Sequence, residues 1–246
     1  MKVSVCMATY NGEKFIQEQL QSILIQLNSI DEVIISDDGS TDNTINIINS
    51  FNDKRIILVF NKSQKKGYTP NFENALKYSS GDIIFLSDQD DVWLPDKYDF
   101  VIACLKNSDL VVTNSMVTDE NLNVTNQSFF SIYNSGPGIL KNIFCSTYYG
   151  CCMAFNRKIL NYAMPFPQYK DTGIDLWIGL VAEVMGKVQF IDQPLLLWRR
   201  SDSATTNLGS IFTRSNRPLH LKLYKRWMGL YNLSKVAIKY KIQCKW

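Results

Sequence analysis

The first half of the chain alternates short apolar runs with longer segments of helical periodicity. The apolar runs are rich in Val and Ile, and we expect buried parallel strands at 3–8, 32–36, 55–60, 82–87 and 110–113. Polar and apolar residues at helical spacing predict helices between them, at 13–27, 42–51, 71–78 and 96–106. This regular alternation predicts an α/β fold with a doubly wound, mostly parallel sheet.

From about residue 115 the alternation weakens. Residues 121–138 are polar and rich in turn-forming residues, and the later pattern predicts helices at 139–145 and 174–185 and strands at 150–155, 188–191 and 195–199. We expect this half to complete the sheet and to build the second wall of a cleft. Beyond Pro218, apolar residues recur near a helical period, interleaved with basic ones, which predicts an amphipathic helix.

Three polar clusters follow predicted strands directly. Thr9–Gly12 follows the first strand, Asp37–Ser40 the second and Asp88–Asp91 the fourth. In an open α/β sheet, ligands bind outside the carboxyl ends of the strands, where the strand order reverses. The three clusters therefore predict a single binding rim.

The cluster of Asp88, Asp90 and Asp91 places three carboxylates within four residues. Like charges this close are unfavourable, and a divalent cation with oxygen ligands resolves the conflict. Mg²⁺ or Mn²⁺ suits a site made of carboxylates and substrate phosphates. The alternative is an Asp-rich turn that caps the helix beginning near Pro95.

The cluster after the second strand also has two interpretations. Ser40 or Thr41 can cap the following helix, and one acid is sufficient for such a turn. The second carboxylate of the Asp37–Asp38 pair is then available to a nucleotide base or ribose. Thr9 and Asn11 can also form hydrogen bonds to a nucleotide. Each of these residues is as well suited to stabilise a turn as to contact a ligand.

Composition and charge narrow the class of protein. No apolar run approaches the ~20 residues of a membrane-spanning helix, and the amino-terminal run is too soon interrupted to be a signal peptide, so we expect a cytoplasmic protein. The six cysteines form no C-x-x-C pair and are expected to be reduced. No nucleic-acid recognition motif accompanies the basic residues.

The charge of the chain is polarised. The net charge is +3, but nine of the 26 bases follow residue 202 and no acid does, so residues 1–202 carry 17 bases against 23 acids, or −6. The basic, aromatic tail has two interpretations: a helix lying on an anionic membrane surface, or a helix packed on the domain with a solvated basic face.

The three clusters together resemble the family 2 glycosyltransferases of the GT-A fold. The matching motifs are Ala8–Gly12, Asp37–Asp42 and Ser87–Trp93, and the likeness covers residues 1 to about 200. The Ser-Asp-Gln-Asp-Asp-x-Trp form resembles bacterial enzymes that assemble O-antigen and capsular polysaccharides. The resemblance implies a Rossmann-like sheet, a nucleotide-sugar donor and inversion at the anomeric carbon.

The resemblance also assigns expected roles to individual residues. It implies that Asp90 binds the metal, and that Asp91, Trp93, Arg199 and Arg200 are candidates for contacts with the diphosphate or acceptor. The residues expected to line the nucleotide-sugar pocket are Thr9, Tyr10, Asn11, Asp37, Asp38, Lys66, Gly67, Asn71, Asp88 and Gln89.

The family further implies a catalytic base at the start of a helix beside the acceptor. Asp175 occupies that place, and a carboxylate there can remove the proton of the attacking hydroxyl. The alternative is that Asp175 closes the helix end as in a capping box with Thr172, and Asp171 is then the second candidate for the base.

One departure from the family pattern concerns histidine. Relatives often carry a histidine after the strand equivalent to 195–199, where it helps to bind metal or diphosphate, and another just before the base. Here Arg200 and Ser201–Ser203 stand at the first place and Ile174 at the second, and the only histidine is His220. Arg199 or Arg200 can contact the diphosphate instead, or Asp202 the metal.

The sequence therefore predicts an inverting, metal-dependent hexosyltransferase of surface polysaccharide synthesis. It would move a sugar from a UDP- or dTDP-sugar to a saccharide or polyprenyl-diphosphate-linked acceptor, with the tail as a peripheral contact to the inner face of the membrane. We expect a domain at 1–212, with a nucleotide-sugar half at 1–115 and an acceptor half at 116–212, and a tail at 213–246. The alternatives are a sugar nucleotidyltransferase, which should carry a Gly-rich phosphate loop after the first strand, and a degenerate nucleotide-sugar-binding subunit.

Overall fold

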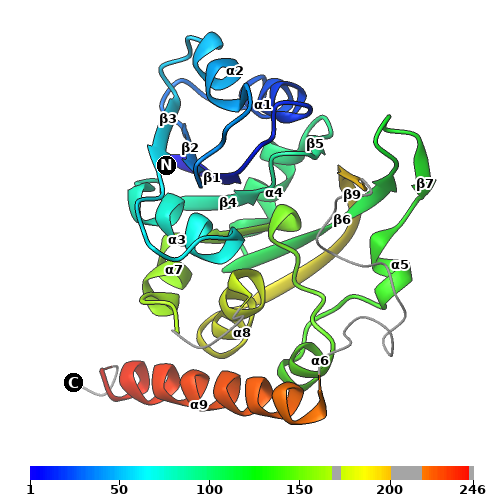
Figure 1. Ribbon diagram of the computed structural model, residues 1–246. Helices are drawn as coiled ribbons and strands as arrows, with labels where there is room; N and C mark the ends of the chain where they lie inside the picture. The colour runs from blue at the N-terminus through cyan, green and yellow to red at the C-terminus, as the bar shows by residue number, and fades with distance from the viewer. Residues whose placement is uncertain (168–172, 201–217, 244–246) are drawn as a thin grey trace.

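The computed structural model describes residues 1–167, 173–200 and 218–243. Its strands form one nine-stranded sheet in the order β3-β2-β1-β4-β8-β6-β9-β5, with β7 beside β6 (Figure 1). The strands are β1 (Val3–Thr9), β2 (Glu32–Asp37), β3 (Ile56–Phe60), β4 (Ile83–Ser87), β5 (Val92–Trp93), β6 (Leu110–Thr118), β7 (Val124–Asn126), β8 (Met153–Asn156) and β9 (Val188–Arg199). The helices are α1 (Ile16–Leu24), α2 (Thr44–Ser50), α3 (Tyr68–Tyr78), α4 (Lys97–Leu105), α5 (Phe129–Tyr133), α6 (Ile139–Phe144), α7 (Arg157–Ala163), α8 (Ile174–Met185) and α9 (Leu219–Gln243), with a 3-10 turn at Gly150–Cys152.

The first half of the sheet is parallel, as the apolar runs predict. β1 pairs in parallel with both β2 and β4, and β2 with β3. Every residue of β2 and β4 is buried, which explains why these strands are continuous apolar runs with little alternation. Because the strands are parallel, the polar residues that follow β1, β2 and β4 meet at one edge.

The second half makes the sheet mixed. β8 runs antiparallel between β4 and β6, and β5 runs antiparallel to β9. The two strands expected at 188–191 and 195–199 are a single strand, β9, parallel to β6. The register shifts where Asn114 faces Pro194, since proline has no N–H to donate to the ladder.

Several short elements were not predicted from the sequence. These are β5, β7, α5 and α7, and the strand expected at 150–155 begins only at Met153, after the 3-10 turn. The periodicity of such short segments is too brief to distinguish them from loops. The alternation of the first half and the helices at 139–145 and 174–185 are confirmed.

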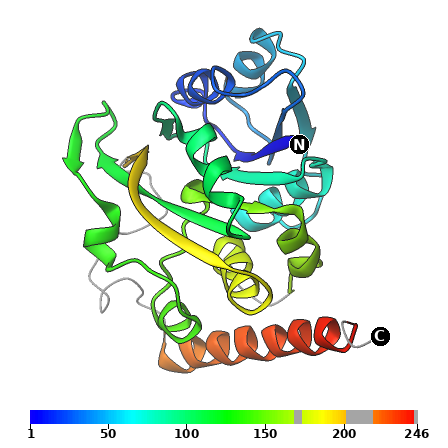
Figure 2. The ribbon, with the colours of Figure 1, turned by 180° about the vertical axis from the view of Figure 1, so that it is seen from behind.

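Helices cover both faces of the sheet. α3 contacts β1, β2 and α8 on one face, whereas α4 contacts β6 and β8 on the other (Figures 1 and 2). α9 runs across the end of the molecule opposite α1 and α2, against α6, α7 and α8. No described helix is long and apolar enough to cross a membrane. The five cysteines among the described residues are free.

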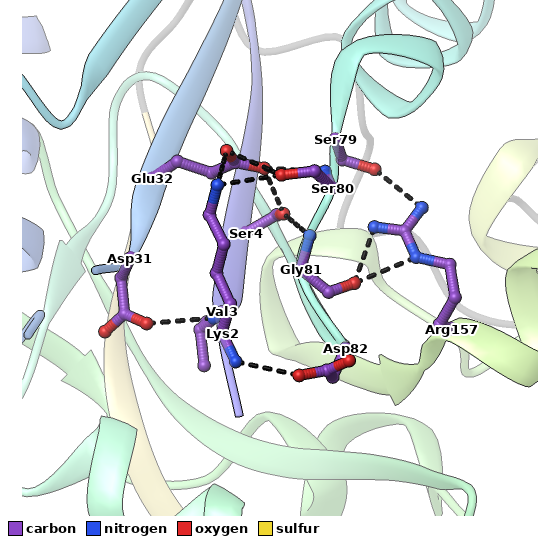
Figure 3. Close-up of polar contacts among 10 residues, drawn as sticks. All are labelled: Lys2, Val3, Ser4, Asp31, Glu32, Ser79, Ser80, Gly81, Asp82 and Arg157. Carbon is purple, nitrogen blue, oxygen red and sulfur yellow. Dashed lines mark hydrogen bonds and ion pairs between the residues drawn. The ribbon is translucent and has the colours of Figure 1, made fainter.

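A polar network closes the end of the sheet opposite the polar clusters (Figure 3). Glu32, which is 4% exposed, accepts hydrogen bonds from Lys2 Nζ, from Ser4 Oγ at 2.6 Å and from the Ser80 N–H at 2.6 Å. The Arg157 guanidinium donates to the Gly81 carbonyl at 2.8 and 2.6 Å. These contacts connect the starts of β1, β2, β4 and α7. They also supply hydrogen bonds to the Glu32 carboxylate, whose charge would otherwise be costly to bury.

We predict that Glu32→Gln lowers the free energy of unfolding by about 1–3 kcal/mol near neutral pH, because its hydrogen bonds are charge-assisted. Burial opposes ionisation of Glu32, but the hydrogen bonds from Lys2, Ser4 and Ser80 outweigh it and lower the pKa. A lowered folded-state pKa adds stability above the unfolded-state pKa, and this stability is lost as the pH falls through the folded value. Urea denaturation at several pH values should show the difference from wild type disappearing in acid.

The matched control is Glu73→Gln. Glu73 pairs with Lys77 one turn later on α3, where the lysine side chain is 54% exposed, and such i,i+4 helical pairs contribute about 0.3–0.5 kcal/mol. Equal losses in both variants would contradict the role given to the Glu32 network.

Candidate active site

Gln89 joins the loops that follow β1 and β4. Its side-chain oxygen accepts hydrogen bonds from Thr9 Oγ1 at 2.5 Å and from the Tyr10 N–H at 3.0 Å, and its amide donates to the Tyr10 carbonyl at 3.1 Å. A Cβ on Gly12 would lie 2.4 Å from this side-chain oxygen, so only glycine leaves room for the amide. Thr9 and Gln89, both expected at the nucleotide pocket, thus contact each other directly.

The two acids after β2 differ in their contacts. Asp37 is 1% exposed and accepts hydrogen bonds from the N–H groups of Gly39 and Ser40, both at 2.9 Å, so its carboxylate builds the turn. Asp38 faces the loop after β3, where it accepts from Asn61 Nδ2 at 2.8 Å and from the Gly67 N–H at 2.7 Å. The sequence left open which of the two acids makes the turn, and these contacts assign that task to Asp37.

The other expected pocket residues lie on the same rim. Lys66 Nζ is 3.4 Å from Asp38, and the Lys66 side chain is 53% exposed. The Asn71 amide donates to the Thr9 carbonyl at 3.0 Å, while its buried side-chain oxygen has no hydrogen-bond partner. Asn11 adopts a left-handed φ of 47° and accepts from the Thr41 N–H at 2.9 Å. The structure therefore brings the ends of β1, β2 and β3 together.

The acidic loop after β4 turns one carboxylate inward. Asp91 is fully buried, and one of its oxygens accepts the Arg199 N–H at 3.1 Å while the other has no hydrogen-bond partner. Asp88, Asp91 and Cys151 offer ligand atoms that all lie within 4.8 Å of one another. A buried, unpartnered carboxylate oxygen beside a second acid fits a divalent cation in this loop.

The pKa values of the three acids in this loop are raised, so their ionised forms are disfavoured. Burial, followed by the negative charges of Asp90 and Asp175, raises the pKa of Asp88 to about 7. Burial and the charges of Asp90 and Asp88 raise the pKa of Asp91 well above its usual value. The pKa of Asp90 is also raised, chiefly by burial, and Arg199 and Arg200 oppose this effect. A cation would relieve the repulsion.

Lys97 is a buried cation beneath the acidic loop. It is 2% exposed, donates to the Cys151 carbonyl at 2.8 Å and lies 4.8 Å from the centre of the Trp93 ring. Burial lowers its pKa, whereas the charges of the cysteines, Asp91 and Asp88 raise it. The sequence contained a signal that we missed: Lys97 is four residues before Val101 and eight before Leu105, on the buried face of α4.

Arg199 secures the acidic loop from the end of β9. Its backbone N–H binds Asp91, its Nε donates to the Asp90 carbonyl at 2.8 Å, and its remaining nitrogens bind Glu18 and the Glu120 carbonyl. Arg199 is 5% exposed. These contacts favour a positioning role over the diphosphate contact expected from the sequence. No sequence signal linked Glu18 and Arg199, which are 181 residues apart.

Trp93 and Arg200 complete this side of the rim. Trp93 is 3% exposed and packs 5.1 Å from the Phe85 ring, so its contacts support the loop from beneath. Arg200 is partly buried above the Trp198 ring at 4.8 Å, and its charge acts on Asp90. Of the four candidates for diphosphate or acceptor contact, Arg200 is therefore the least enclosed. Asp171 and Asp202 lie outside the described residues.

Asp175 lies at the start of α8, close enough for its charge to raise the pKa of Asp88. Its Oδ1 accepts the Leu176 N–H at 2.8 Å. Burial raises the pKa of Asp175 to about 6, and hydrogen bonds from the N–H groups of Leu176 and Gly150 oppose the rise. A carboxylate with this pKa is suited to accept a proton near neutral pH.

Comparison with known proteins identifies the family. The family model for glycosyl transferase family 2 matches residues 4–162, which include β1 except its first residue, β2 to β4 and the whole acidic loop. The chain belongs to glycosyltransferase family 2. This agrees with the resemblance carried by the three polar clusters.

Two relatives are named for nucleotide-sugar donors. The chain is 30% identical over 184 residues to the UDP-Glc:alpha-D-GlcNAc-diphosphoundecaprenol beta-1,3-glucosyltransferase WfgD of Escherichia coli, covering 74% of this chain and 70% of WfgD. It is 44% identical over 105 residues to the dTDP-rhamnosyl transferase RfbG of Shigella flexneri, covering 40% of this chain and 36% of RfbG. The match to an uncharacterized glycosyltransferase of Nostoc sp. spans 65% of that protein.

Solved structures confirm the fold. Staphylococcus aureus TarS 1–349 in complex with UDP-GlcNAc has a TM-score of 0.72 to this chain at 18% identity, covering 98% of this chain and 71% of TarS. Glucosyl-3-phosphoglycerate synthase from Mycobacterium tuberculosis, bound to Mn²⁺ and UDP, has a TM-score of 0.58 at 17% identity, covering 96% of this chain and 80% of the synthase. The mixed sheet is therefore that of GT-A glycosyltransferases.

We predict that Asp88→Asn raises the melting temperature of the metal-free protein near pH 8. The folded-state pKa of Asp88 is raised to about 7, so ionisation costs stability as the pH rises from the unfolded-state value through the folded one. The gain should disappear near pH 4, where the wild-type carboxyl is protonated. Differential scanning fluorimetry across this pH range measures the effect.

The control is Asp99→Asn at an exposed position in the first turn of α4, where loss of a negative charge near the helix N-terminus should lower the melting temperature slightly at pH 8 and not raise it. A lower melting temperature for Asp88→Asn at pH 8 would contradict the view that this carboxylate is held at an energetic cost.

Proposed function

We propose that the chain is an inverting, metal-dependent hexosyltransferase of surface polysaccharide synthesis. It would transfer a sugar from a UDP- or dTDP-sugar to a saccharide or a lipid-linked saccharide. The observation that carries this proposal is the gathering of Asp88, Asp90, Asp91 and Asp175 in one region, where burial raises the pKa values of all four carboxylates and the charges of neighbouring acids raise those of Asp88 and Asp91 further. Such a group of acids supports both metal binding and proton transfer.

The donor nucleotide is assigned to the end of the rim formed by β1, β2 and β3. The Asp38 carboxylate lies beside the Lys66 ammonium group and the Asn61 amide. A carboxylate in this position can accept hydrogen bonds from ribose hydroxyls or from the N–H of a pyrimidine. Thr9, Asn11 and Asp37 hold the backbone of this pocket. Tyr10, 55% exposed, presents a ring at the same end.

The metal would be Mn²⁺ or Mg²⁺, held by the acidic loop. Asp90 is the ligand that the family pattern implies, whereas the ligand atoms that lie within 4.8 Å of one another belong to Asp88, Asp91 and Cys151. When bound, such an ion neutralises the diphosphate charge that develops on departure. The Arg200 guanidinium, whose charge acts on Asp90, is proposed to stabilise the diphosphate where relatives have histidine.

Asp175 is proposed as the base. It would accept the proton of the acceptor hydroxyl while that oxygen attacks the anomeric carbon on the face opposite the diphosphate. The attack forms the new glycosidic bond as the bond to the diphosphate breaks, so the anomeric configuration inverts. At the first turn of α8 its carboxylate is held by backbone N–H groups, among them those of Leu176 and Gly150.

The choice of substrate class follows the relatives. WfgD is named for a UDP-glucose donor and a diphosphoundecaprenol-linked acceptor, and RfbG for dTDP-rhamnose. We propose a donor and an acceptor of these chemical classes for this chain. Screening UDP- and dTDP-sugars with Mn²⁺ for thermal stabilisation would identify the donor, because a bound ligand raises the melting temperature by mass action.

We predict that Asp175→Asn lowers kcat by about 10²- to 10⁴-fold, the usual loss of a general base, with little change in the donor KM. In the wild type, kcat/KM should rise with pH through an apparent pKa near 6, because Asp175 must be ionised to accept the proton. In the Asp175→Asn variant, this rise of kcat/KM with pH should be absent. Asp171→Asn is the matched control, and a larger loss in that variant would transfer the role of base to Asp171.

We predict that Asp90→Asn raises the Mn²⁺ concentration needed for half-maximal transfer by at least about ten-fold. Calorimetry of UDP binding with and without Mn²⁺ gives a second measure that does not require an acceptor. Wild-type protein that binds UDP equally well without Mn²⁺ would contradict the metal-dependent proposal. Release of pyrophosphate from a nucleoside triphosphate would instead favour a nucleotidyltransferase.

A further inference from the structure

The helix α9 is fixed to the body through one face only. Leu233, at mid-helix, is 5% exposed. Towards the amino end, Arg226 lies 4.5 Å from the ring of Phe144 on α6. Towards the carboxyl end, the Tyr240 hydroxyl donates to the Asn161 carbonyl of α7 at 3.2 Å, and its ring lies 4.5 Å from that of Tyr162. The helix is therefore docked along much of its length.

The opposite face of α9 carries an outer stripe of exposed apolar side chains. At 100° per residue, these project away from the side that bears Leu233. Trp227 is 60% and Ile238 59% exposed, and the Trp227 and Tyr231 rings stack at 5.5 Å. The outer stripe consists of Tyr224, Trp227, Tyr231 and Ile238, and the exposed Leu223 and Leu230 flank it on one side. Isolated exposed apolar residues need no explanation, but a continuous stripe does.

Basic residues surround the outer stripe. The sequence of α9 contains six Lys or Arg and no acid. Lys235 and Lys239 are exposed, and Lys235 Nζ lies 4.2 Å from the centre of the Tyr231 ring. The body of the molecule, residues 1–202, has a net charge of −6. The positive charge is therefore concentrated where the apolar stripe is exposed.

We propose that α9 binds the surface of an anionic lipid bilayer, with the outer stripe inserted at the level of the headgroups. Trp, Tyr, Leu and Ile partition into this interface, and flanking Lys and Arg are attracted to anionic lipids. The commitment to lipid rests on this charge complementarity. A second copy of the chain would bring two basic helices together, which is unfavourable unless their charges are screened.

This inference goes beyond the transfer reaction and also specifies an orientation. α9 contacts α6, α7 and α8, and the first turn of α8 carries Asp175. Exposed Leu140 and Phe144 on α6 extend the apolar surface beside α9. Binding through α9 would place the half of the molecule that carries the proposed base next to the bilayer. This second step rests on the proposed function, because a lipid-linked acceptor enters from that surface.

Vesicle flotation with the full chain tests the proposal without requiring activity. The protein should float with vesicles of phosphatidylcholine and phosphatidylglycerol. With vesicles of phosphatidylcholine alone, the fraction of protein that floats should be at least about ten-fold lower. Trp227→Ala combined with Ile238→Ala should weaken binding to anionic vesicles by about ten-fold or more. Lys235→Gln combined with Lys239→Gln should weaken it by about five-fold per charge, and wild-type binding should fall as salt rises.

The controls are the exposed Ile25→Ala and Lys106→Gln, which immediately follow α1 and α4. Both should float as well as wild type. No binding to anionic vesicles, or equal binding by the Trp227 and Ile238 double variant, overturns the proposal. So does a dimer in solution that this double variant dissociates, because a second copy would then cover the outer stripe. Transfer to a soluble acceptor should be unchanged in the α9 variants, which separates this test from that of the proposed reaction.

Discussion

The structure holds several carboxylates close together at the edge of a buried sheet, and the rest of the candidate site is built around them. Asp91 is fully enclosed, and the charges of its neighbours act on it in a poorly solvated environment. The nearby positive side chains bind backbone carbonyls and not the carboxylates of the acidic loop. Lys97 donates to the Cys151 carbonyl beneath the loop, and Arg199, at the end of β9, donates to the Asp90 carbonyl. Neither forms a side-chain ion pair with the acidic loop, so the carboxylates retain coordinating capacity. This arrangement trades stability for a site that can bind a cation.

The residues that support the loop come from widely separated parts of the chain. Gln19 on α1 donates to the Ser87 hydroxyl and the Asp88 carbonyl, at 2.8 and 2.9 Å. Arg199 approaches from the last strand, and Glu18 connects it back to α1. The acidic loop can form only when α1, β4 and β9 are all in place. The site and the long-range topology are consequently interdependent.

The first half of the fold could be predicted from sequence because its signals are local. Parallel buried strands are continuous apolar runs, and the polar clusters after β1, β2 and β4 are adjacent because those strands pair. The division of labour between Asp37 and Asp38 could not be predicted, because the two residues are neighbours of identical chemistry. Their roles depend on Asn61 and Gly67, which the loop after β3 brings to Asp38.

The supporting role of Arg199 was also beyond the sequence, because a cation in a motif suggests an anionic ligand as readily as a carbonyl partner. Similarly, β8 reads as an apolar run whether it pairs in parallel or antiparallel. Direction is decided by the route of the connecting chain, which periodicity does not report. Lys97 is the exception, since the helical spacing of α4 already placed it among buried residues.

The contact between Gln89 and the loop after β1 has a consequence for altering substrate choice. One amide joins Thr9 and Tyr10 to the acidic loop, and Gly12 leaves the room it needs. The proposed nucleotide pocket and the acidic loop are therefore directly connected. Residues of this connection are poor targets for redesign, since a change at either end would disturb both. Variation in the walls, around Lys66 on one side and α8 on the other, would leave the connection intact. A family can thus diversify its sugars and acceptors while keeping the same central machinery.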